Sequence, residues 1–195
     1  MKLKKLISAL KDYQIFNSIN YEDLEVTGIS FDSRKVKQGD IFVAIKGENF
    51  DGHKFIRYAA ENGAIAVVCE NLKHISNFKI PFLIVGNSRE VLAILSAAFY
   101  SQPARKMRII GVTGTDGKTT TATIIYNILK SAGFRVGLIT SINAVIGNEI
   151  YDTGFHITTP NAVDMQKHLA EMLSADTEYV VIEASSHGLA QHRVD

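Results

Sequence analysis

Cysteine is almost absent from this sequence. Cys69 is the single cysteine among 195 residues, so no disulfide can form within the chain. It falls inside the apolar run 64–69, where a cysteine reads as a small core residue. The composition excludes a disulfide-stabilised scaffold and fits a reducing cytosol.

Long hydrophobic runs and an excess of one charge are also lacking. No apolar stretch approaches the roughly 18 residues that a membrane-spanning helix needs, and the N-terminal apolar run, which ends at Lys11, is too short for a signal peptide. Lys and Arg number 21 against 20 Asp and Glu, so nucleic acid is disfavoured as a partner and any anion site has to be local. We therefore expect a cytoplasmic protein without membrane insertion.

Apolar residues are plentiful, at 46%, which is enough for a substantial core. In the first half of the chain, alternating segments predict an α/β layer. The expected helices are 3–12, 53–62 and 88–100, the last with Ser88 as N-cap, the segment between 12 and 24 is expected to be irregular, and the expected strands are 25–31, 40–45, 64–69 and 81–85. The polar stretch 101–106, S-Q-P-A-R-K, predicts a boundary, so we expect a domain at 1–103 and another at 104–195.

The second half reads as a strand, a glycine-containing loop and a helix, followed by further strands. Strands are expected at 107–112, 135–140 and 179–183, helices at 118–132 and 161–174, and a small hairpin at 144–151. Two or three such strands predict a mainly parallel sheet that looks unfinished. Ligands of parallel sheets bind at the carboxyl ends of the strands.

The stretch 111–119, G-V-T-G-T-D-G-K-T, predicts a phosphate-binding loop. It departs from the strict P-loop spacing, because its outer glycine is Gly111 rather than position 112. A β-branched strand before the loop and a helix after it would direct backbone N–H groups toward an anion, with Lys118 neutralising phosphate charge and Thr119 binding Mg²⁺. The alternative interpretation is a glycine turn with an exposed lysine.

Glu183 ends the apolar strand Y-V-V-I-E, where a P-loop enzyme often keeps an acidic metal ligand. The alternative for Glu183 is a strand-end carboxylate paired with a basic neighbour. The following segment, S-S-H-G-L-A-Q-H-R-V, favours substrate binding over a nucleophile pair or a zinc site, because no nucleophile elbow surrounds Ser186 and His187 lacks metal-ligand spacing. Asp32, Ser33 and Arg34 fit a simple turn as well as a site.

Together these motifs resemble the Mur ligases, and within that family the branch that adds the third residue of the peptidoglycan stem peptide. The resemblance spans nearly the whole chain and rests on F-D-S-R-K-V-K-Q-G-D-I-F-V-A-I-K-G with D-G-H-K-F-I, on T-G-T-D-G-K-T-T-T, on the T-T-P that ends at Pro160, and on E-A-S-S-H-G-L-A-Q-H-R-V. It implies a UDP-sugar-binding α/β domain followed by the first part of a P-loop, mainly parallel-sheet ATPase domain. It also implies an ATP- and Mg²⁺-dependent ligase that joins diaminopimelate or lysine to UDP-N-acetylmuramoyl-L-Ala-D-Glu through an acyl phosphate. Separately, we expect a monomer.

The resemblance also assigns roles to residues. Lys118 and Glu183 would be catalytic, and Thr119 with Glu183 would hold the metal. ATP would be bound by Gly114, Thr115, Asp116, Gly117, Lys118, Thr119 and Thr120. The UDP-muramoyl-dipeptide would be bound by Phe31, Ser33, Glu48, Asn49, Phe50, Thr158, Thr159, Ser185, Gln191 and Arg193.

Two departures from the family pattern stand out. Asp116 occupies a loop position where the family usually has Asn, and its carboxylate would repel a triphosphate unless it faces away or toward Mg²⁺. The carboxylated lysine, the metal-binding histidine and the amino-acid-selecting domain of full-length relatives find no counterpart, so we expect a truncated chain that does not ligate alone. The other open hypotheses are a non-catalytic module that binds UDP-sugar or nucleotide, and an unrelated P-loop NTPase.

Overall fold

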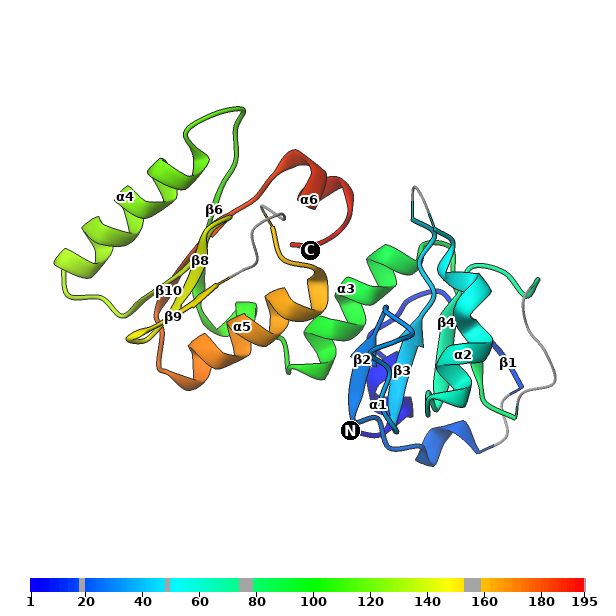
Figure 1. Cartoon of the computed structure of the whole chain (residues 1–195). Helices are drawn as coiled ribbons and strands as arrows, with labels where there is room; N and C mark the ends of the chain where they lie inside the picture. The colour runs from blue at the N-terminus through cyan, green and yellow to red at the C-terminus, as the bar shows by residue number, and fades with distance from the viewer. Residues whose placement is uncertain (18–19, 48–49, 74–78, 153–158, 195) are drawn as a thin grey trace. The chain divides into compact units, whose positions relative to one another are not determined.

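The computed structural model describes residues 1–17, 20–47, 50–73, 79–152 and 159–194. The chain divides into two compact units, residues 1–99 and residues 100–195, which Figure 1 draws in one cartoon. Each unit contains a sheet rich in parallel pairs and covered by helices. The predicted α/β fold class is confirmed.

Unit 1 contains one five-stranded sheet among its described residues, in the order β1-β5-β4-β3-β2. Strands β2 to β5 are parallel neighbours, and β1 is antiparallel to β5. In chain order the elements are α1 (Leu3–Ile7), β1 (Gln14–Phe16), the 3₁₀ helix η1 (Tyr21–Asp23), β2 (Gly28–Ser30), β3 (Asp40–Val43), η2 (Gly52–Phe55), α2 (Ile56–Glu61), β4 (Ala66–Cys69), β5 (Phe82–Ile84) and α3 (Ser88–Phe99).

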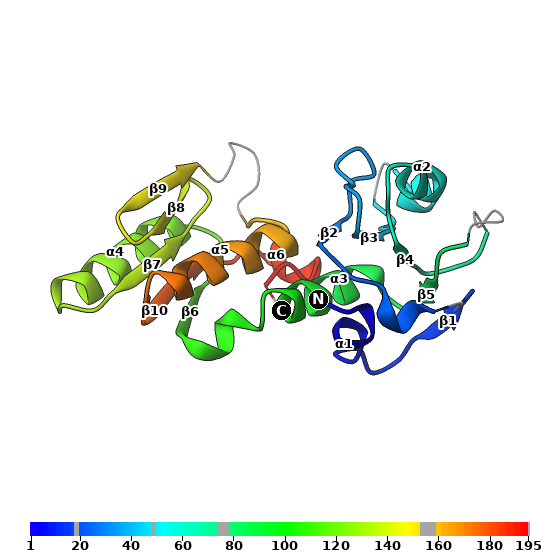
Figure 2. The same cartoon turned by 90° about the horizontal axis from the view of Figure 1, so that it is seen from below.

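The core of unit 1 forms because β3 and β4 are buried along their whole length. Strands that are buried in this way need cover on both faces of the sheet. Helix α2 covers one face, where Ile56 and Ala59 pack against Phe42, Val67 and Phe82. Figure 2 shows α2 on one side of the sheet and α1 with α3 on the other.

Three expectations for unit 1 were wrong in detail. The first helix ends at Ile7, and a strand and a 3₁₀ turn, β1 and η1, occupy part of the stretch expected to be irregular. Asn87, and not Ser88, caps α3: its Oδ1 accepts from the backbone N–H groups of Arg89 and Glu90. Ser88 is the first helical residue and is buried against Glu70, a long-range contact that local capping rules do not register.

Unit 2 contains a second five-stranded sheet in its described part, in the order β6-β10-β7-β8-β9. Strands β6, β10 and β7 are parallel, and β8 and β9 form an antiparallel hairpin that extends the sheet beyond β7. The elements are η3 (Pro103–Lys106), β6 (Arg108–Val112), α4 (Lys118–Ser131), β7 (Val136–Ile139), β8 (Asn143–Ile146), β9 (Glu149–Asp152), α5 (Ala162–Ser174), β10 (Tyr179–Glu183) and α6 (Ser186–Ala190).

Helices α4 and α5 cover opposite faces of this sheet, as Figure 1 shows. Side chains of β10 reach both helices, because successive side chains of a strand point to opposite faces of the sheet. Val181 packs in the α4-side cluster with Ala122, whereas Val180 packs in the α5-side cluster with Leu169.

The expectation of only two or three strands in this sheet was wrong. The predicted hairpin is present, but it joins the sheet and brings it to five strands. Strand β10 lies between β6 and β7, so the first and second parallel strands are not neighbours. This insertion positions the site, because it places the end of β10 directly beside the loop that follows β6. The short helix α6 was also not predicted.

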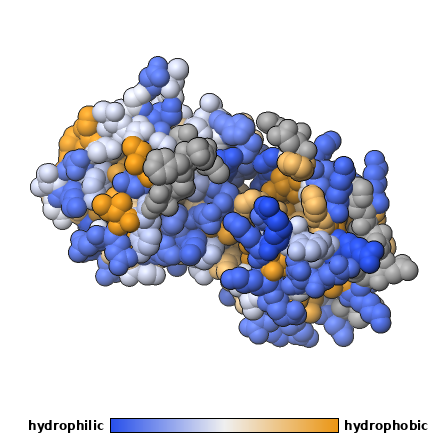
Figure 3. Space-filling model, viewed as in Figure 1, coloured by the Kyte–Doolittle hydropathy of each residue, from blue (hydrophilic) through white to orange (hydrophobic). Residues whose placement is uncertain are grey.

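None of the helices in the described residues is long and apolar enough to cross a bilayer. On the face drawn in Figure 3, apolar groups form separate patches within a mostly hydrophilic surface.

Candidate nucleotide-binding site

The glycine loop between β6 and α4 has the backbone that its sequence predicts. Gly114 has φ 151° and Gly117 has φ 73°, values at which a side chain would strain the backbone. Gly117 is the N-cap of α4, and no side chain caps the helix there. The first-turn N–H groups of a 14-residue helix are therefore available to an anion, with the positive end of the helix dipole behind them.

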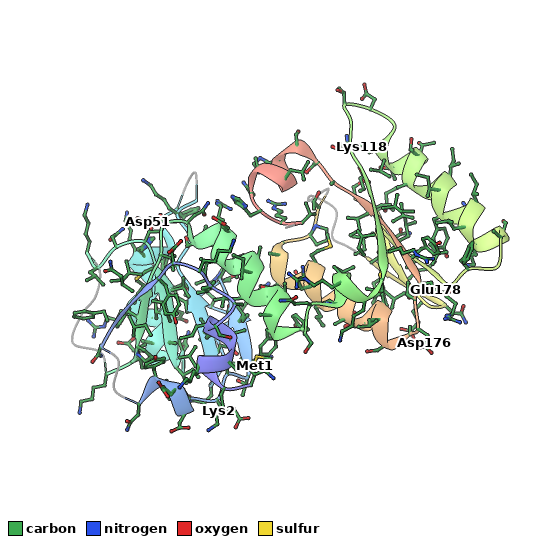
Figure 4. All side chains as sticks on the ribbon, turned by 180° about the vertical axis from the view of Figure 1, so that it is seen from behind. Met1, Lys2, Asp51, Lys118, Asp176 and Glu178 are labelled. Carbon is green, nitrogen blue, oxygen red and sulfur yellow. The ribbon has the colours of Figure 1, made fainter. Side chains whose placement is uncertain are left out.

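Lys118 lies over this loop. Its Nζ donates to the carbonyl oxygens of Gly114 and Thr115, each at 2.9 Å. Figure 4 shows Lys118 at the end of the sheet opposite Asp176 and Glu178, which precede β10. The ammonium therefore lies at the carboxyl end of the parallel strands, where ligands of such sheets bind.

Thr119 and Glu183 are in direct contact. Thr119 Oγ1 donates to Glu183 Oε2 at 2.9 Å, and the strand register places Glu183 opposite Val112, the last residue before the loop. The Glu183 side chain is buried, with the residue 2% exposed. The structure thus brings together the two residues that the sequence suggested as metal ligands.

Ser141 also belongs to this cluster, and the sequence reasoning missed it. Its backbone N–H and its Oγ donate to Glu183 Oε2 at 3.0 and 3.2 Å, and its Oγ lies 3.3 Å from Thr119 Oγ1. The available signal was the polar pair of Thr140 and Ser141 immediately after an apolar strand, because a parallel neighbour of β10 ends beside Glu183.

A turn anchors Ser141 in this position. Thr140 is 1% exposed, and its N–H and Oγ1 donate to the carbonyl of Asn143 at 2.9 and 3.1 Å. Its Oγ1 also accepts from the backbone N–H groups of Ile142 and Asn143, each at 3.2 Å. These bonds fix the backbone that aims the Ser141 N–H at Glu183.

The chemistry of this cluster fits Mg²⁺. Among the described residues no group of three His, Cys, Asp or Glu side chains could hold a metal by itself. Mg²⁺ commonly takes one or two protein oxygens and completes its shell with water and substrate phosphates, which matches Thr119 and Glu183 beside a phosphate loop. Within the described chain, neutral donors and no basic side chain contact the buried Glu183 carboxylate, so a cation would fit there.

A second polar cluster follows Glu183 along the chain. Ser185 caps α6, with its Oγ accepting from the N–H of Gly188 at 3.0 Å. Thr159 is fully buried, and its Oγ1 accepts from the N–H of Ser185 at 3.1 Å and lies 3.2 Å from Ser185 Oγ. Two substrate-binding residues expected from the resemblance therefore touch each other.

Arg193 holds this second cluster together. Its Nη1 donates to the carbonyl of Thr159 at 2.8 Å, and its Nη2 and Nε donate to Gln191 Oε1 at 2.7 and 3.2 Å. Gln191 Nε2 also lies 2.7 Å from His187 Nε2. Arg193 as a whole is partly buried, and its guanidinium lies between Thr159 and Gln191.

Unit 1 contains the remaining candidates. Ser33 is buried, with its carbonyl accepting from Asn62 Nδ2 at 3.0 Å, while Phe31 and Phe50 are 38% and 76% exposed. Glu48, Asn49 and Thr158 lie outside the described residues. Phe31 and Ser33 are two residues apart, in the turn that follows β2.

Asp32 and Arg34 form the ion pair expected of a simple turn. Arg34 Nε and Nη2 donate to the two carboxylate oxygens at 2.9 and 2.8 Å, and the Arg34 N–H donates to Oδ1. The hydrogen bonds and charge of Arg34 lower the pKa of Asp32 below its usual value. This contact fixes the turn that carries Ser33.

The D-G-H segment has a structural role that the sequence reasoning did not identify. His53 is 1% exposed, its Nε2 accepts from the N–H of Glu70 at 2.9 Å, and its Nδ1 therefore carries the proton donated to Asp51 Oδ1 at 2.6 Å. Gly52 leaves room for the backbone of Ile45, 2.8 Å from where a Cβ would be. Buried polar side chains that are fully paired in this way fix the loop preceding α2.

A groove of about 220 Å³ opens beside the loop between α4 and the strands β7 and β8. It begins at Thr119 and continues along Thr123 and Asn127 of α4 toward Asn143 and Val145 of β8. The Asp116 side chain, in the loop itself, is exposed.

Two family models, both of Mur ligase domains, match the sequence. "Mur ligase family, catalytic domain" matches residues 25–100, and "Mur ligase middle domain" matches residues 112–195. The chain belongs to the Mur ligase family and carries its N-terminal and middle domains.

Similar curated relatives point to one branch of this family. The UDP-N-acetylmuramoyl-L-alanyl-D-glutamate–2,6-diaminopimelate ligases of Bacillus licheniformis and Phocaeicola vulgatus are 41% and 38% identical to the chain over 194 residues. These alignments include 100% of this chain but 38% and 39% of the relatives. The chain thus spans less than half the length of the curated relatives it matches.

Solved structures agree with this assignment. A UDP-N-acetylmuramoyl-L-alanyl-D-glutamate–2,6-diaminopimelate ligase aligns with all of this chain and 38% of its own, at a TM-score of 0.78 and 26% identity. MurF ligase from Thermotoga maritima, in complex with ADP, aligns with 84% of this chain and 32% of its own, at a TM-score of 0.52 and 30% identity.

Proposed function

We propose that this chain provides the UDP-sugar-binding domain and the nucleotide-binding front of a ligase. The complete reaction would add a third amino acid, diaminopimelate or lysine, to UDP-N-acetylmuramoyl-L-Ala-D-Glu at the expense of ATP, in the cytoplasm and as a monomer. The names of the similar proteins support the reaction class. The observation that carries the proposal is the contact between Thr119 and Glu183 at the end of the loop that holds Lys118.

The chemistry requires a carboxylate and a triphosphate, both negatively charged, to approach each other. In the proposed reaction the substrate carboxylate attacks the γ-phosphorus, ADP leaves, and the incoming amine displaces phosphate from the acyl phosphate. The loop N–H groups and Lys118 would stabilise charge on the phosphate oxygens. A bound Mg²⁺, held by Thr119 and Glu183, would neutralise further phosphate charge.

The cluster around Arg193 would bind the anionic nucleotide sugar. A planar guanidinium pre-oriented by Thr159 and Gln191 suits a phosphate or carboxylate, because it can donate two parallel hydrogen bonds. Ser185 and Thr158 would contribute further contacts. In unit 1, Phe31, Ser33 and the loop 48–50 would bind the uridine end.

Calorimetric titration of the whole chain tests both halves of this proposal. A non-hydrolysable ATP analogue with Mg²⁺ should bind the wild-type chain and fail to bind Lys118→Met, a variant with a similar side-chain length and no charge. UDP-N-acetylmuramoyl-L-Ala-D-Glu should bind the wild type and the Lys118→Met variant alike, and bind Arg193→Met more weakly. If neither ligand binds the wild-type chain, the proposed function is wrong.

A further inference from the structure

The third member of the Glu183 cluster, Ser141, has a hydroxyl group whose partners suggest a specific task. Its Oγ donates to Glu183 Oε2 at 3.2 Å and lies 3.3 Å from Thr119 Oγ1. The backbone N–H of Ser141 separately donates to the same carboxylate oxygen, at 3.0 Å. Any residue at position 141 other than proline would keep the N–H contact, so the hydroxyl needs its own explanation.

Hydrogen-bond accounting at Thr119 provides that explanation. A threonine hydroxyl has one proton and two lone pairs. If a lone pair of Thr119 Oγ1 binds a cation, the proton still needs an acceptor. In the structure that acceptor is Glu183 Oε2, an oxygen of the other expected metal ligand. The nearby Ser141 Oγ is the alternative acceptor for this hydrogen bond. The Ser141 hydroxyl can in turn donate its own hydrogen bond to Glu183.

We propose that Ser141 is a positioning residue of the divalent-cation site. Its hydroxyl accepts a hydrogen bond from the Thr119 hydroxyl and donates one to Glu183, and these two hydrogen bonds keep both ligands oriented toward the cation. The inference rests on the proposed function and goes further, because it assigns a role to a residue outside the expected metal ligands. Outer-shell partners of this kind fix ligand orientation. The turn around Thr140 holds the backbone in place whatever side chain follows it.

Threonine and valine at position 141 form a matched pair that isolates the hydroxyl. The two side chains have nearly the same shape, and Ser141 is half-buried. Ser141→Thr keeps the two proposed hydroxyl hydrogen bonds, whereas Ser141→Val removes them and retains the backbone N–H. Ser141→Ala serves as a second hydroxyl-free variant if valine prevents folding.

The experiment measures Mn²⁺ binding to the whole chain saturated with ADP, by electron paramagnetic resonance, and ADP binding without a metal, by calorimetry. We expect Ser141→Val and Ser141→Ala to weaken Mn²⁺ binding by about tenfold or more, and Ser141→Thr to stay within about twofold of wild type. Metal-free ADP affinity and thermal unfolding should stay the same in all folded variants.

The outcomes separate this inference from the proposed function. Equal Mn²⁺ affinity for Ser141→Val and Ser141→Thr would overturn the role of the hydroxyl and leave the nucleotide site intact. An equal loss of metal-free ADP affinity would also overturn it, because the effect would then be structural. A wild-type chain that binds ADP but no Mn²⁺ would refute the cation site itself, and one that binds neither would refute the proposed function as well.

Discussion

Thr119, in the first turn of α4, and Glu183, the last residue of β10, are joined by a hydrogen bond of 2.9 Å across 64 residues of sequence. Two features of the fold produce this contact. Strand β10 is inserted between β6 and β7, and its register with β6 ends at the residue before the glycine loop. A buried carboxylate is thereby placed against the helix start that a phosphate would approach.

Glu183→Gln should weaken cation binding without disturbing the fold. The amide oxygen can still accept from Thr119 and from the Ser141 N–H, whereas the negative charge is lost. We expect Mn²⁺ affinity in the presence of ADP to fall by more than about tenfold, because losing a direct ligand should cost at least as much as losing a residue that only orients one. Thermal unfolding with and without ADP is the control. Unchanged Mn²⁺ affinity would rule out Glu183 as a ligand.

Asp116→Asn should tighten nucleotide binding. The Asp116 carboxylate is exposed in the phosphate loop, where it adds negative charge. Because solvent screens exposed charges, we expect a gain of only roughly two- to fivefold in affinity for an ATP analogue at low salt. Calorimetry at low and high salt should show the gain shrinking as ionic strength rises. Weaker binding by Asp116→Asn would instead indicate that Asp116 faces Mg²⁺.

Gly188→Ala should destabilise unit 2, although alanine is the better helix former. A Cβ at position 188 would lie 2.8 Å from Thr159 Cβ and Oγ1, and Thr159 is fully buried and cannot move away. Overpacking of this kind costs about 1–3 kcal/mol. Chemical denaturation measures the loss, and weaker binding of UDP-muramoyl-dipeptide should accompany it.

Gly111→Ala is the matched control for that experiment. Gly111 is in the same unit, and nothing lies within 4 Å of its Cβ position. We expect the stability of Gly111→Ala to stay close to wild type. If both variants lose the same stability, steric contact with Thr159 is not the cause.

The stability of the chain should fall in alkaline solution because of Cys69. Burial raises the pKa of this thiol from 9.0 to about 11. Below pH 9 both the folded and the unfolded chain keep the thiol proton, so Cys69 adds no pH dependence. Between pH 9 and 11 only the unfolded chain ionises, which favours unfolding by up to about 2–3 kcal/mol at pH 11.

Urea denaturation at pH 8 and pH 10.5 measures this effect against Cys69→Ala. The alanine variant loses packing at both pH values, but its stability should fall less between them than that of the wild type. Equal slopes for the two proteins would show that the thiol does not ionise on unfolding.

The sequence predicted the elements of the site better than their spatial order. The loop at 111–119 could be recognised because its features are local in sequence. It has two glycines with positive φ, and a helix begins directly after the second one. The insertion of β10 between β6 and β7 could not be predicted from the sequence, because strand order depends on long-range pairing. Ser141 was missed for the same reason.

Arg193 and Gly188 illustrate two further limits. The resemblance suggested that Arg193 binds an anion, but its contacts with Thr159 and Gln191 required the fold. Gly188 looked like an ordinary residue of a polar segment, and its need for a bare Cα arises only where α6 meets Thr159. The wrong Ser88 cap has a similar origin, because the hydroxyl of Ser88 bonds Glu70, a residue distant in sequence.

The most direct test of the account is the affinity of the whole chain for a non-hydrolysable ATP analogue, measured by calorimetry with and without Mg²⁺. The contact between Thr119 and Glu183 beside Lys118 predicts binding that tightens when Mg²⁺ is added, with this gain lost in Glu183→Gln. Binding that ignores Mg²⁺, or a wild-type chain that does not bind the analogue, would contradict the account.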